Sequence, residues 1–181
     1  MFGKSLGADG AELRPLEPWQ AEEFFAHMER GREFIGQHIG FADRAKDLES
    51  ARELLQGYAD KAAADTGRIF GIWLDDKLVG GVLIRVMDVP QGRAEVGVWL
   101  EPAATGQGLI TRAAKVLIGW LIRERGVHRV EWLVSSANAP SIAVARRLGM
   151  RQDGVLRSYH PYRGVRQDLE VWSVLAPEWE S

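Results

Sequence analysis

The segment from Ala94 to Arg125 most constrains the fold, because it predicts a strand, a glycine loop and a long amphipathic helix in direct succession. From Ala94 to Leu100 the side chains alternate between two faces, the period of two that is typical of a half-buried strand. The loop over 105–108 contains two glycines. From Leu109 to about Arg125 apolar residues recur at helical spacing. One strand face carries Ala94, Val96, Val98 and Leu100, and the other carries Glu95, Gly97 and Trp99.

The glycine loop predicts a binding site for an anion, most simply a pyrophosphate. A helix start has unpaired N–H groups and a positive dipole end, and Gly106 and Gly108 remove the side chains that would keep an anion away. No Gly-Lys-Ser/Thr follows, so this is not a Walker loop, and Thr111 stands where a dinucleotide fingerprint has its third glycine. Two glycines before a helix also occur in tight strand-to-helix turns, so the loop alone leaves both interpretations open.

Two motifs together extend the argument. VGVWLEPAATGQGLITRA, followed by NAPSIAVARRLGM, resembles the GNAT superfamily of acyl-CoA-dependent N-acyltransferases, in its RimJ/RimL-like branch. Gly106 and Gly108 match the superfamily loop pattern Q/R-x-x-G-x-G/A, whereas Ala103 occupies the Gln/Arg position. The resemblance covers the chain from about Arg68 to its end. The branch's second motif is matched by Asn138, Ser141, Leu148, Gly149 and Met150.

The resemblance implies a fold and a co-substrate. We expect a mixed sheet in which acetyl-CoA, or another acyl-CoA, lies between two splayed strands with its pyrophosphate on the amides of the glycine loop. No metal is implied. The residues expected to hold the acyl-CoA are Val98, Trp99, Leu100, Thr105, Gly106, Gln107, Gly108, Leu109, Ile110, Thr111, Asn138 and Ser141.

Composition narrows the functional class. The 181 residues suffice for one domain with a substantial core, and we expect a single N-acyltransferase domain over 1–181. The net charge of -2 gives no electrostatic case for nucleic acid or an anionic membrane as partner. The absence of cysteine excludes disulfides, zinc-thiolate sites and a cysteine-bound acyl intermediate. No apolar run approaches the ~20 residues of a membrane span, and no signal peptide is visible, so the expected location is cytoplasmic.

The remaining patterns predict an α/β (α+β) fold with a mixed, mostly antiparallel central sheet flanked by helices. The first ten residues suggest a loose lead-in, and 32–41 a shorter helical or looped piece rich in aromatics. Further strands are predicted over 12–16, 68–74, 77–88, 128–136, 155–159 and 166–175, and further helices over 18–30, 47–64 and 141–148.

Acyl transfer to an amine requires removal of a proton, because an ammonium has no lone pair and an amine pKa near ~10 leaves little free base at neutral pH. Glu95 shares a strand face with Gly97, where the missing side chain leaves room for a ligand, and it is our candidate general base. The alternative is an exposed carboxylate in a surface ion pair. His160, between two tyrosines in a turn, is the rival base.

The departing thiolate needs a proton. Many GNAT enzymes supply it from a tyrosine seven residues after the motif asparagine, but here that position is Ala145. Ser141 lies one helical turn after Asn138, and we expect its hydroxyl to bond the coenzyme sulfur, unless it only bonds local backbone. The candidate partners for a further phosphate of the coenzyme are Arg112, Arg146 and Arg147.

The amine acceptor is not identified by any motif. A protein N-terminus and a small amine are both compatible with the resemblance, and Phe34, His38 and His160 are candidate contacts, with Phe41 a further aromatic that fits the core. Two other classes remain open, namely a non-catalytic acyl-CoA sensor and a different phosphate-ligand enzyme such as a nucleotide binder. A longer or succinyl donor is also compatible, as is an oligomer.

Overall fold

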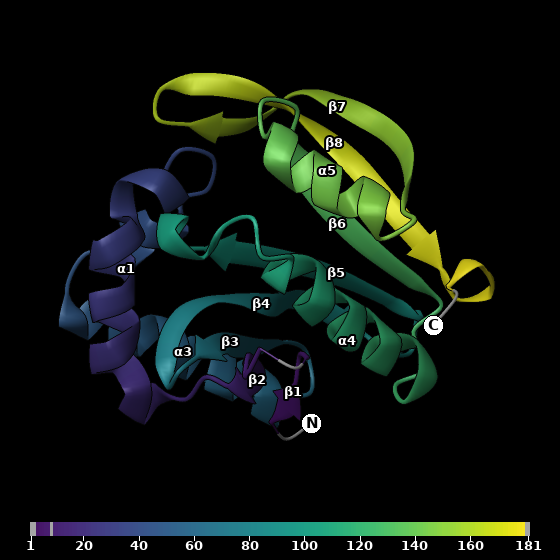
Figure 1. Ribbon diagram of the computed structural model, residues 1–181. Helices are drawn as coiled ribbons and strands as arrows, with labels where there is room; N and C mark the ends of the chain where they lie inside the picture. Colours follow the sequence, from purple (N-terminus) through teal and green to yellow (C-terminus); the bar gives the residue numbers. More distant parts are fainter. Residues whose placement is uncertain (1–2, 8, 180–181) are drawn as a thin grey trace.

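A computed structural model of the chain, which describes residues 3–7 and 9–179, has one eight-stranded sheet covered by helices on both faces (Figure 1). The strand order is β1-β2-β3-β4-β5-β6-β8-β7, and every neighbouring pair is antiparallel except β5 and β6. The strands are β1 (Lys4–Ser5), β2 (Glu12–Pro15), β3 (Arg68–Leu74), β4 (Lys77–Asp88), β5 (Arg93–Leu100), β6 (Arg129–Ser135), β7 (Arg151–Tyr162) and β8 (Val165–Leu175). The α-helices are α1 (Ala21–Ile35), α2 (Phe41–Arg44), α3 (Leu48–Ala63), α4 (Leu109–Arg123) and α5 (Ala139–Arg147). The predicted fold class is confirmed.

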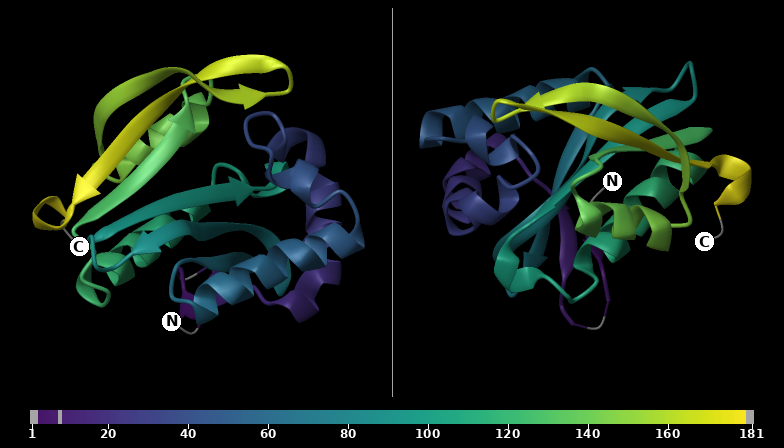
Figure 2. Two further views of the ribbon diagram at one scale, coloured as in Figure 1. Left: turned by 180° about the vertical axis from the view of Figure 1, so that it is seen from behind. Right: turned by 90° about the horizontal axis from the view of Figure 1, so that it is seen from above.

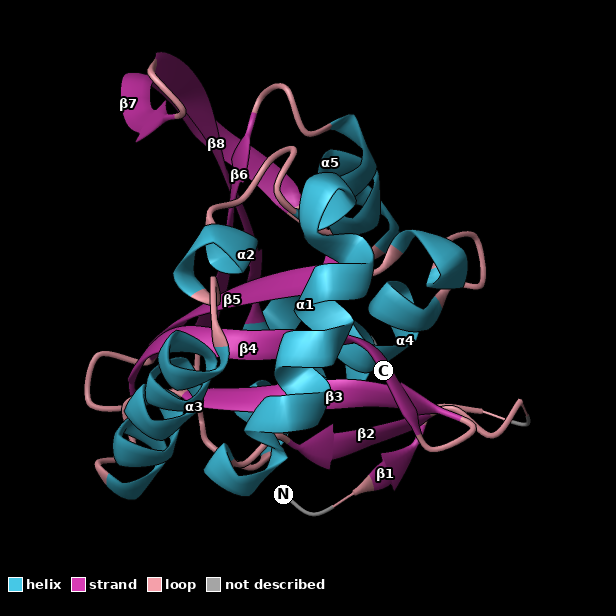
Figure 3. Cartoon of the chain, turned by 90° about the vertical axis from the view of Figure 1, so that its left-hand side faces the viewer, coloured by secondary structure: helices cyan, strands magenta, loops and turns pink. Residues whose placement is uncertain are grey.

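The helices divide between two faces of the sheet. On one face α1, α2 and α3 cover the strands, as Figure 3 shows, and Phe24, Leu55 and Trp99 are buried there. On the other face α4 and α5 pack around Leu117 and Trp132. The two faces of β5 therefore carry the two sets of side chains that the period of two predicts.

The pairing between β5 and β6 is short. It extends over four residue pairs, from Arg93↔Arg129 to Val96↔Trp132, and then ends. β6 continues along β8 as far as Ser135↔Leu169. Beyond Val96 the two strands therefore diverge, and the sheet opens as a V toward α1 (Figures 1 and 2). We call this gap the sheet opening.

Several elements differ from their predicted bounds. The lead-in contains β1, whose two residues pair with β2. α1 continues past Arg30 to Ile35, and this takes in the first part of the piece expected over 32–41. β7 and β8 are longer than predicted and turn at Arg163-Gly164. Of the predicted lead-in, residues 1, 2 and 8 lie outside the described part of the chain. None of the helices in that part is both long and apolar enough to span a bilayer.

Candidate active site

A cavity of about 620 Å³ occupies the sheet opening and is lined by residues from both faces of the sheet. This volume is in the usual range for a site that binds a small molecule. The glycine loop and α5 line one part, and the segment 34–40, β4 and the end of β7 line another. Of the residues predicted to hold the acyl-CoA, all but Gln107 line the cavity.

The glycine loop presents free backbone donors to the cavity. The N–H groups of residues 106–111 donate to no backbone or side-chain acceptor in the described part of the chain. Gly106 and Gly108 have φ of +79° and +69°, and a Cβ at either position would meet no atom within 4 Å. Open space above unpaired amides at the start of a fifteen-residue helix fits a pyrophosphate. Ala103, in the short turn Pro102–Ala104, adds no polar side chain to this donor set.

The three candidate phosphate-binding arginines have different environments. Arg112 bonds Asp9 and the carbonyl oxygen of Leu6, so it fastens α4 to the N-terminal segment. Arg146 stacks over Trp172 at 5.5 Å, and neither Arg112 nor Arg146 lines the cavity. Arg147 lines the cavity, and it is the one of the three that is placed to meet a ligand there.

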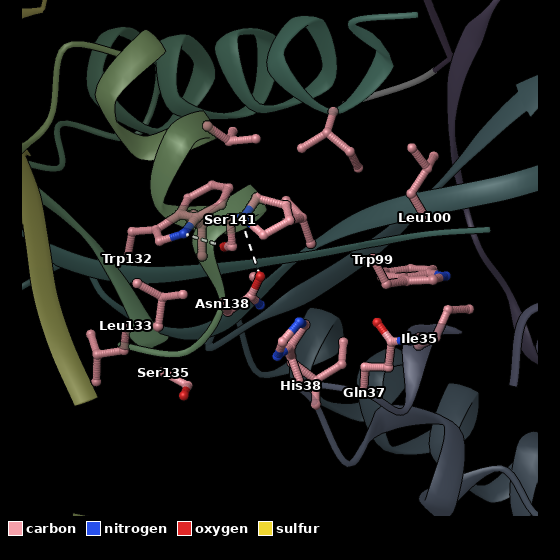
Figure 4. A pocket seen from close by; sticks show the side chains of 18 of the residues that line it. Ile35, Gln37, His38, Trp99, Leu100, Trp132, Leu133, Ser135, Asn138 and Ser141 are labelled. Atoms are coloured by element: carbon pink, nitrogen blue, oxygen red, sulfur yellow. Dashed lines mark hydrogen bonds between the residues drawn. The ribbon is translucent and has the colours of Figure 1, made fainter. Parts of the chain in front are cut away.

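Asn138 and Ser141 form the start of α5, as Figure 4 shows. Asn138 caps the helix, since its Oδ1 accepts the N–H of Ser141 at 3.2 Å. The hydroxyl of Ser141 accepts the indole N–H of Trp132 at 3.0 Å rather than bonding local backbone. An oxygen that already accepts a bond from Trp132 still has its own proton to donate, and both serine and tryptophan line the cavity.

Glu95 lies on the α1–α3 face of the sheet, where it is largely buried and lines the cavity. Burial raises the pKa of its carboxyl above the ordinary value, and the nearby Arg85 opposes this effect. Arg85 Nε lies 3.3 Å from Glu95 Oε1. A carboxylate with a raised pKa in a cavity is a suitable proton acceptor.

Trp99 forms part of the cavity wall and is fixed by a buried polar network. Its indole N–H donates to Nε2 of His27 at 3.0 Å, and Nδ1 of His27 lies 3.1 Å from Oε2 of Glu101. Glu101 also receives Nε of Arg30 at 3.1 Å. Burial lowers the pKa of His27 from 6.5 to about 4, against the opposing effect of Glu101. His27 is therefore neutral, with its proton on Nδ1, and it holds the indole ring in one orientation.

The acceptor side of the cavity is enclosed by a contact between distant segments. Phe34, His38 and His160 all line the cavity, and Phe41 is instead buried in the core. The hydroxyl of Tyr162 donates to the carbonyl oxygen of Gly36 at 2.6 Å and lies 3.1 Å from that of Ile39. The β7–β8 hairpin is thus tied to the segment that follows α1 (Figure 1).

The sequence patterns did not single out four residues of this region, which are Arg85, Trp132, His27 and Glu101. One signal was available for Arg85, because it is a charged residue inside the otherwise apolar run of β4. The roles of His27 and Glu101 depend on contacts between distant parts of the chain, such as His27 with Trp99. The role of Trp132 depends on its bond to Ser141 across the turn between β6 and α5.

Comparisons with known proteins identify the family. The acetyltransferase (GNAT) domain matches residues 11–151. The chain belongs to this family. The GNAT chain is 30% identical over 172 residues to a probable N-acetyltransferase, YjcK, of Bacillus subtilis (strain 168), with 93% of this chain and 95% of that protein covered. It is 20% identical over 166 residues to the ribosomal-protein-serine acetyltransferase of Escherichia coli (strain K12), covering 92% and 93%.

Solved structures have the same fold. A probable acetyltransferase superposes with a TM-score of 0.91 at 27% identity and covers 99% of both chains. The RimL ribosomal L7/L12 alpha-N-protein acetyltransferase in complex with coenzyme A gives a TM-score of 0.89 at 18% identity, with 94% and 96% covered. Membership of the GNAT family confirms the predicted enzyme class, an N-acetyltransferase that uses a CoA thioester.

Proposed function

We propose that the chain transfers an acetyl group from acetyl-CoA to a primary amine, either a protein N-terminus or a small amine, by direct attack within a ternary complex. One observation supports this proposal most strongly. The cavity in the sheet opening brings the unpaired amides of 106–111 and the hydroxyl of Ser141 together with Glu95, although they lie on opposite faces of the sheet. A donor and an acceptor can therefore meet without leaving the protein.

The glycine loop holds the donor. The amides of 106–111 bind the pyrophosphate, and Arg147 is the cation available for a further phosphate. Bound acetyl-CoA supplies an activated thioester. Those backbone N–H groups of 98–100 that point away from β4, where β5 has left β6, polarise the thioester carbonyl, and preorganised donors of this kind are often the largest catalytic contribution.

Glu95 accepts the proton of the attacking amine, directly or through a water. Its raised pKa brings its basicity closer to that of the group it must deprotonate. Ser141 donates its hydroxyl proton toward the coenzyme sulfur, in an orientation set by Trp132. A thiol with pKa near ~8.5 is already a fair leaving group, so Ser141 contributes modestly. His160 is the second candidate for the base.

The proposal extends to the setting of the enzyme. Residues 1–181 act as one catalytic domain, and the expected location is the cytoplasm, where CoA thioesters are available. The E. coli relative's name specifies a ribosomal-protein serine, which supports a protein as one acceptor class.

An assay of free thiol release tests the function directly. Acetyl-, propionyl- and succinyl-CoA are each combined with a panel of small amines and short peptides with free N-termini, and products are identified by mass spectrometry. We expect release with acetyl-CoA that depends on an amine. Near-normal CoA affinity without turnover on any amine would instead favour a non-catalytic sensor. In a thermal-shift screen, greater stabilisation of the protein by ATP or NAD than by CoA would overturn the CoA assignment.

A further inference from the structure

Arg85 is placed in the cavity by an irregularity in the sheet. The register between β4 and β5 shifts between Ile84 and Val86, so that Arg85 is an extra residue in its strand. Bulges of this kind redirect a side chain and are common beside active sites. Lys61 of α3 holds the bulge, since its Nζ donates to the carbonyl oxygen of Arg85 at 2.9 Å. The side chain of Arg85 lines the cavity.

The guanidinium of Arg85 rests on the backbone of β5. A Cβ at Gly97 would lie 2.9 Å from its Nε and 3.1 Å from its Nη2, so the guanidinium fills the place that any other residue at 97 would need. Among the described residues, the guanidinium forms one ion pair, between its Nε and Glu95, and it donates no hydrogen bond to any described residue. The Nη1 and Nη2 donors therefore remain available as a fork for a carboxylate.

The distribution of charged side chains around the cavity distinguishes Arg85 and Glu95 from the other lining residues. Among the described lining residues, the Asp, Glu, Lys and Arg side chains are Arg85, Glu95 and Arg147. Arg147 belongs to α5, the helix that carries Ser141 on the donor side. On the acceptor side a cation and an anion thus stand in contact, and this pattern is complementary to a ligand that carries an ammonium and a carboxylate close together.

We infer that Arg85 is the specificity residue for the acceptor and binds a carboxylate that belongs to the same residue as the reacting amine. This inference rests on the proposed function, because Glu95 receives the amine. Contact between Arg85 and Glu95 requires the two recognised groups to be adjacent in the acceptor. Two sources supply this chemistry, the α-carboxylate of a free amino acid and the side chain of an N-terminal Asp or Glu in a polypeptide.

Matched acceptor pairs distinguish the two sources. L-Alanine is compared with L-alaninamide, and the peptide amide Asp-Ala-Ala-NH₂ with Asn-Ala-Ala-NH₂, at saturating acetyl-CoA. We expect a preference in kcat/KM of at least tenfold for the carboxylate member of one pair. A preference confined to the first pair identifies a free amino acid, and one confined to the second pair an acidic N-terminus.

Variants of Arg85 test its role. Arg85→Gln is expected to raise the KM of the preferred acceptor at least tenfold and to leave the KM of the neutral acceptor within about threefold of the parent value. Arg85→Lys keeps the charge without the fork, so its KM for the preferred acceptor should lie between those of the parent and Arg85→Gln. Arg93→Gln is the matched control. Arg93 lies on β5 and pairs with Glu131 at 3.7 Å, outside the cavity, so the same loss of charge should leave the preference intact.

Each other outcome overturns the inference. Equal kcat/KM within both pairs excludes a carboxylate site. A fall in kcat for acidic and neutral acceptors alike in Arg85→Gln, with a displaced pH profile, shows that Arg85 acts only on the ionisation of Glu95. In both cases acetyl transfer itself stands. Absence of turnover with every amine tested removes the proposed function together with this inference.

Discussion

The buried His27 makes a specific prediction about stability at acidic pH. Its side chain is fully buried, Nδ1 donates to Glu101, and Nε2 accepts the indole N–H of Trp99. A second proton would have to enter on Nε2 and would face another donor. Burial is the main cause that lowers the pKa of His27 to about 4 in the folded chain, from 6.5 when exposed, although the contact with Glu101 opposes it. Protonation therefore favours the unfolded chain.

The size of the effect follows from linkage. The unfolded chain binds this proton below pH 6.5 and the folded chain only near pH 4, so stability is fully present above about pH 6.5 and is lost as the pH falls toward 4. At about 1.4 kcal/mol per pKa unit, the difference between 6.5 and about 4 corresponds to about 3 kcal/mol in total. About 2 kcal/mol of this is expected to disappear between pH 7 and pH 5.

Urea unfolding of the parent and His27→Gln at pH 7, 6 and 5 measures the effect. The amide of glutamine can donate to Glu101 and accept from Trp99 but does not titrate, so the variant should lose about 2 kcal/mol less than the parent over this range. Hydrogen bonds from Arg30 and His27 outweigh the effect of burial and hold the pKa of Glu101 below its usual 4.5, which places its titration below the range tested.

Equal losses in the two proteins would refute the reasoning. A second measurement is independent of the variant's stability, since the imidazole resonance of His27 in the folded parent should not titrate between pH 7 and pH 5. An imidazole that titrates near 6.5 would show that the residue is not held neutral by its surroundings.

Three further predictions concern the cavity. Gly108→Val should weaken CoA binding at least tenfold, about 1.4 kcal/mol by calorimetry, because the side chain would fill the open space above the unpaired amides and be strained at φ +69°. Glu95→Gln should lower kcat by ~10²–10⁴ with little change in CoA affinity, as expected for a lost base. Ser141→Ala should lower kcat about ten- to a hundredfold, the lower end for a positioned proton donor, in a steady-state assay at saturating substrates.

Controls make these predictions decisive. Gly126→Val, at the other end of α4 with φ +67° and no atom near its Cβ, imposes similar backbone strain far from the cavity and should leave CoA affinity unchanged. Unchanged affinity in folded Gly108→Val would reject the loop as the pyrophosphate site. Turnover of Glu95→Gln within a few-fold of the parent would transfer the role to His160. Full activity of Ser141→Ala at unchanged stability would show that the thiolate leaves without the hydroxyl.

The sequence predicts those elements whose signals are local. The strands β3 and β4 were predicted with the bounds that the structure has, because Asp75 and Asp76 mark a tight turn between two apolar runs, and both adopt positive φ. The cap of α5 was also readable, since Asn138 needs only its own helix start. By contrast, β1 spans two residues, too few to show any period.

What the sequence does not predict depends on distant partners. Arg112 has the type and position of a phosphate ligand, but Asp9, 103 residues away, takes its guanidinium. α1 runs through Gly31, a residue of low helix propensity, at a point where the helix lies against Glu101, whose Cβ would be 3.4 Å from a Cβ at this position. The bulge that directs Arg85 into the cavity is a shift in the pairing register between β4 and β5, so the sequence of either strand alone does not predict it.

The sheet opening divides the structure mechanically. Strands β1–β5 with α1–α3 form one block, and β6, β8 and β7 form another, joined in the sheet by four residue pairs at the narrow end. At the wide end Tyr162 fastens the second block to the carbonyl oxygens of Gly36 and Ile39. A ligand bound in the sheet opening contacts both blocks and bridges them. Because a ligand that binds only the folded chain stabilises it, a bound substrate adds to the few contacts that hold the two blocks together.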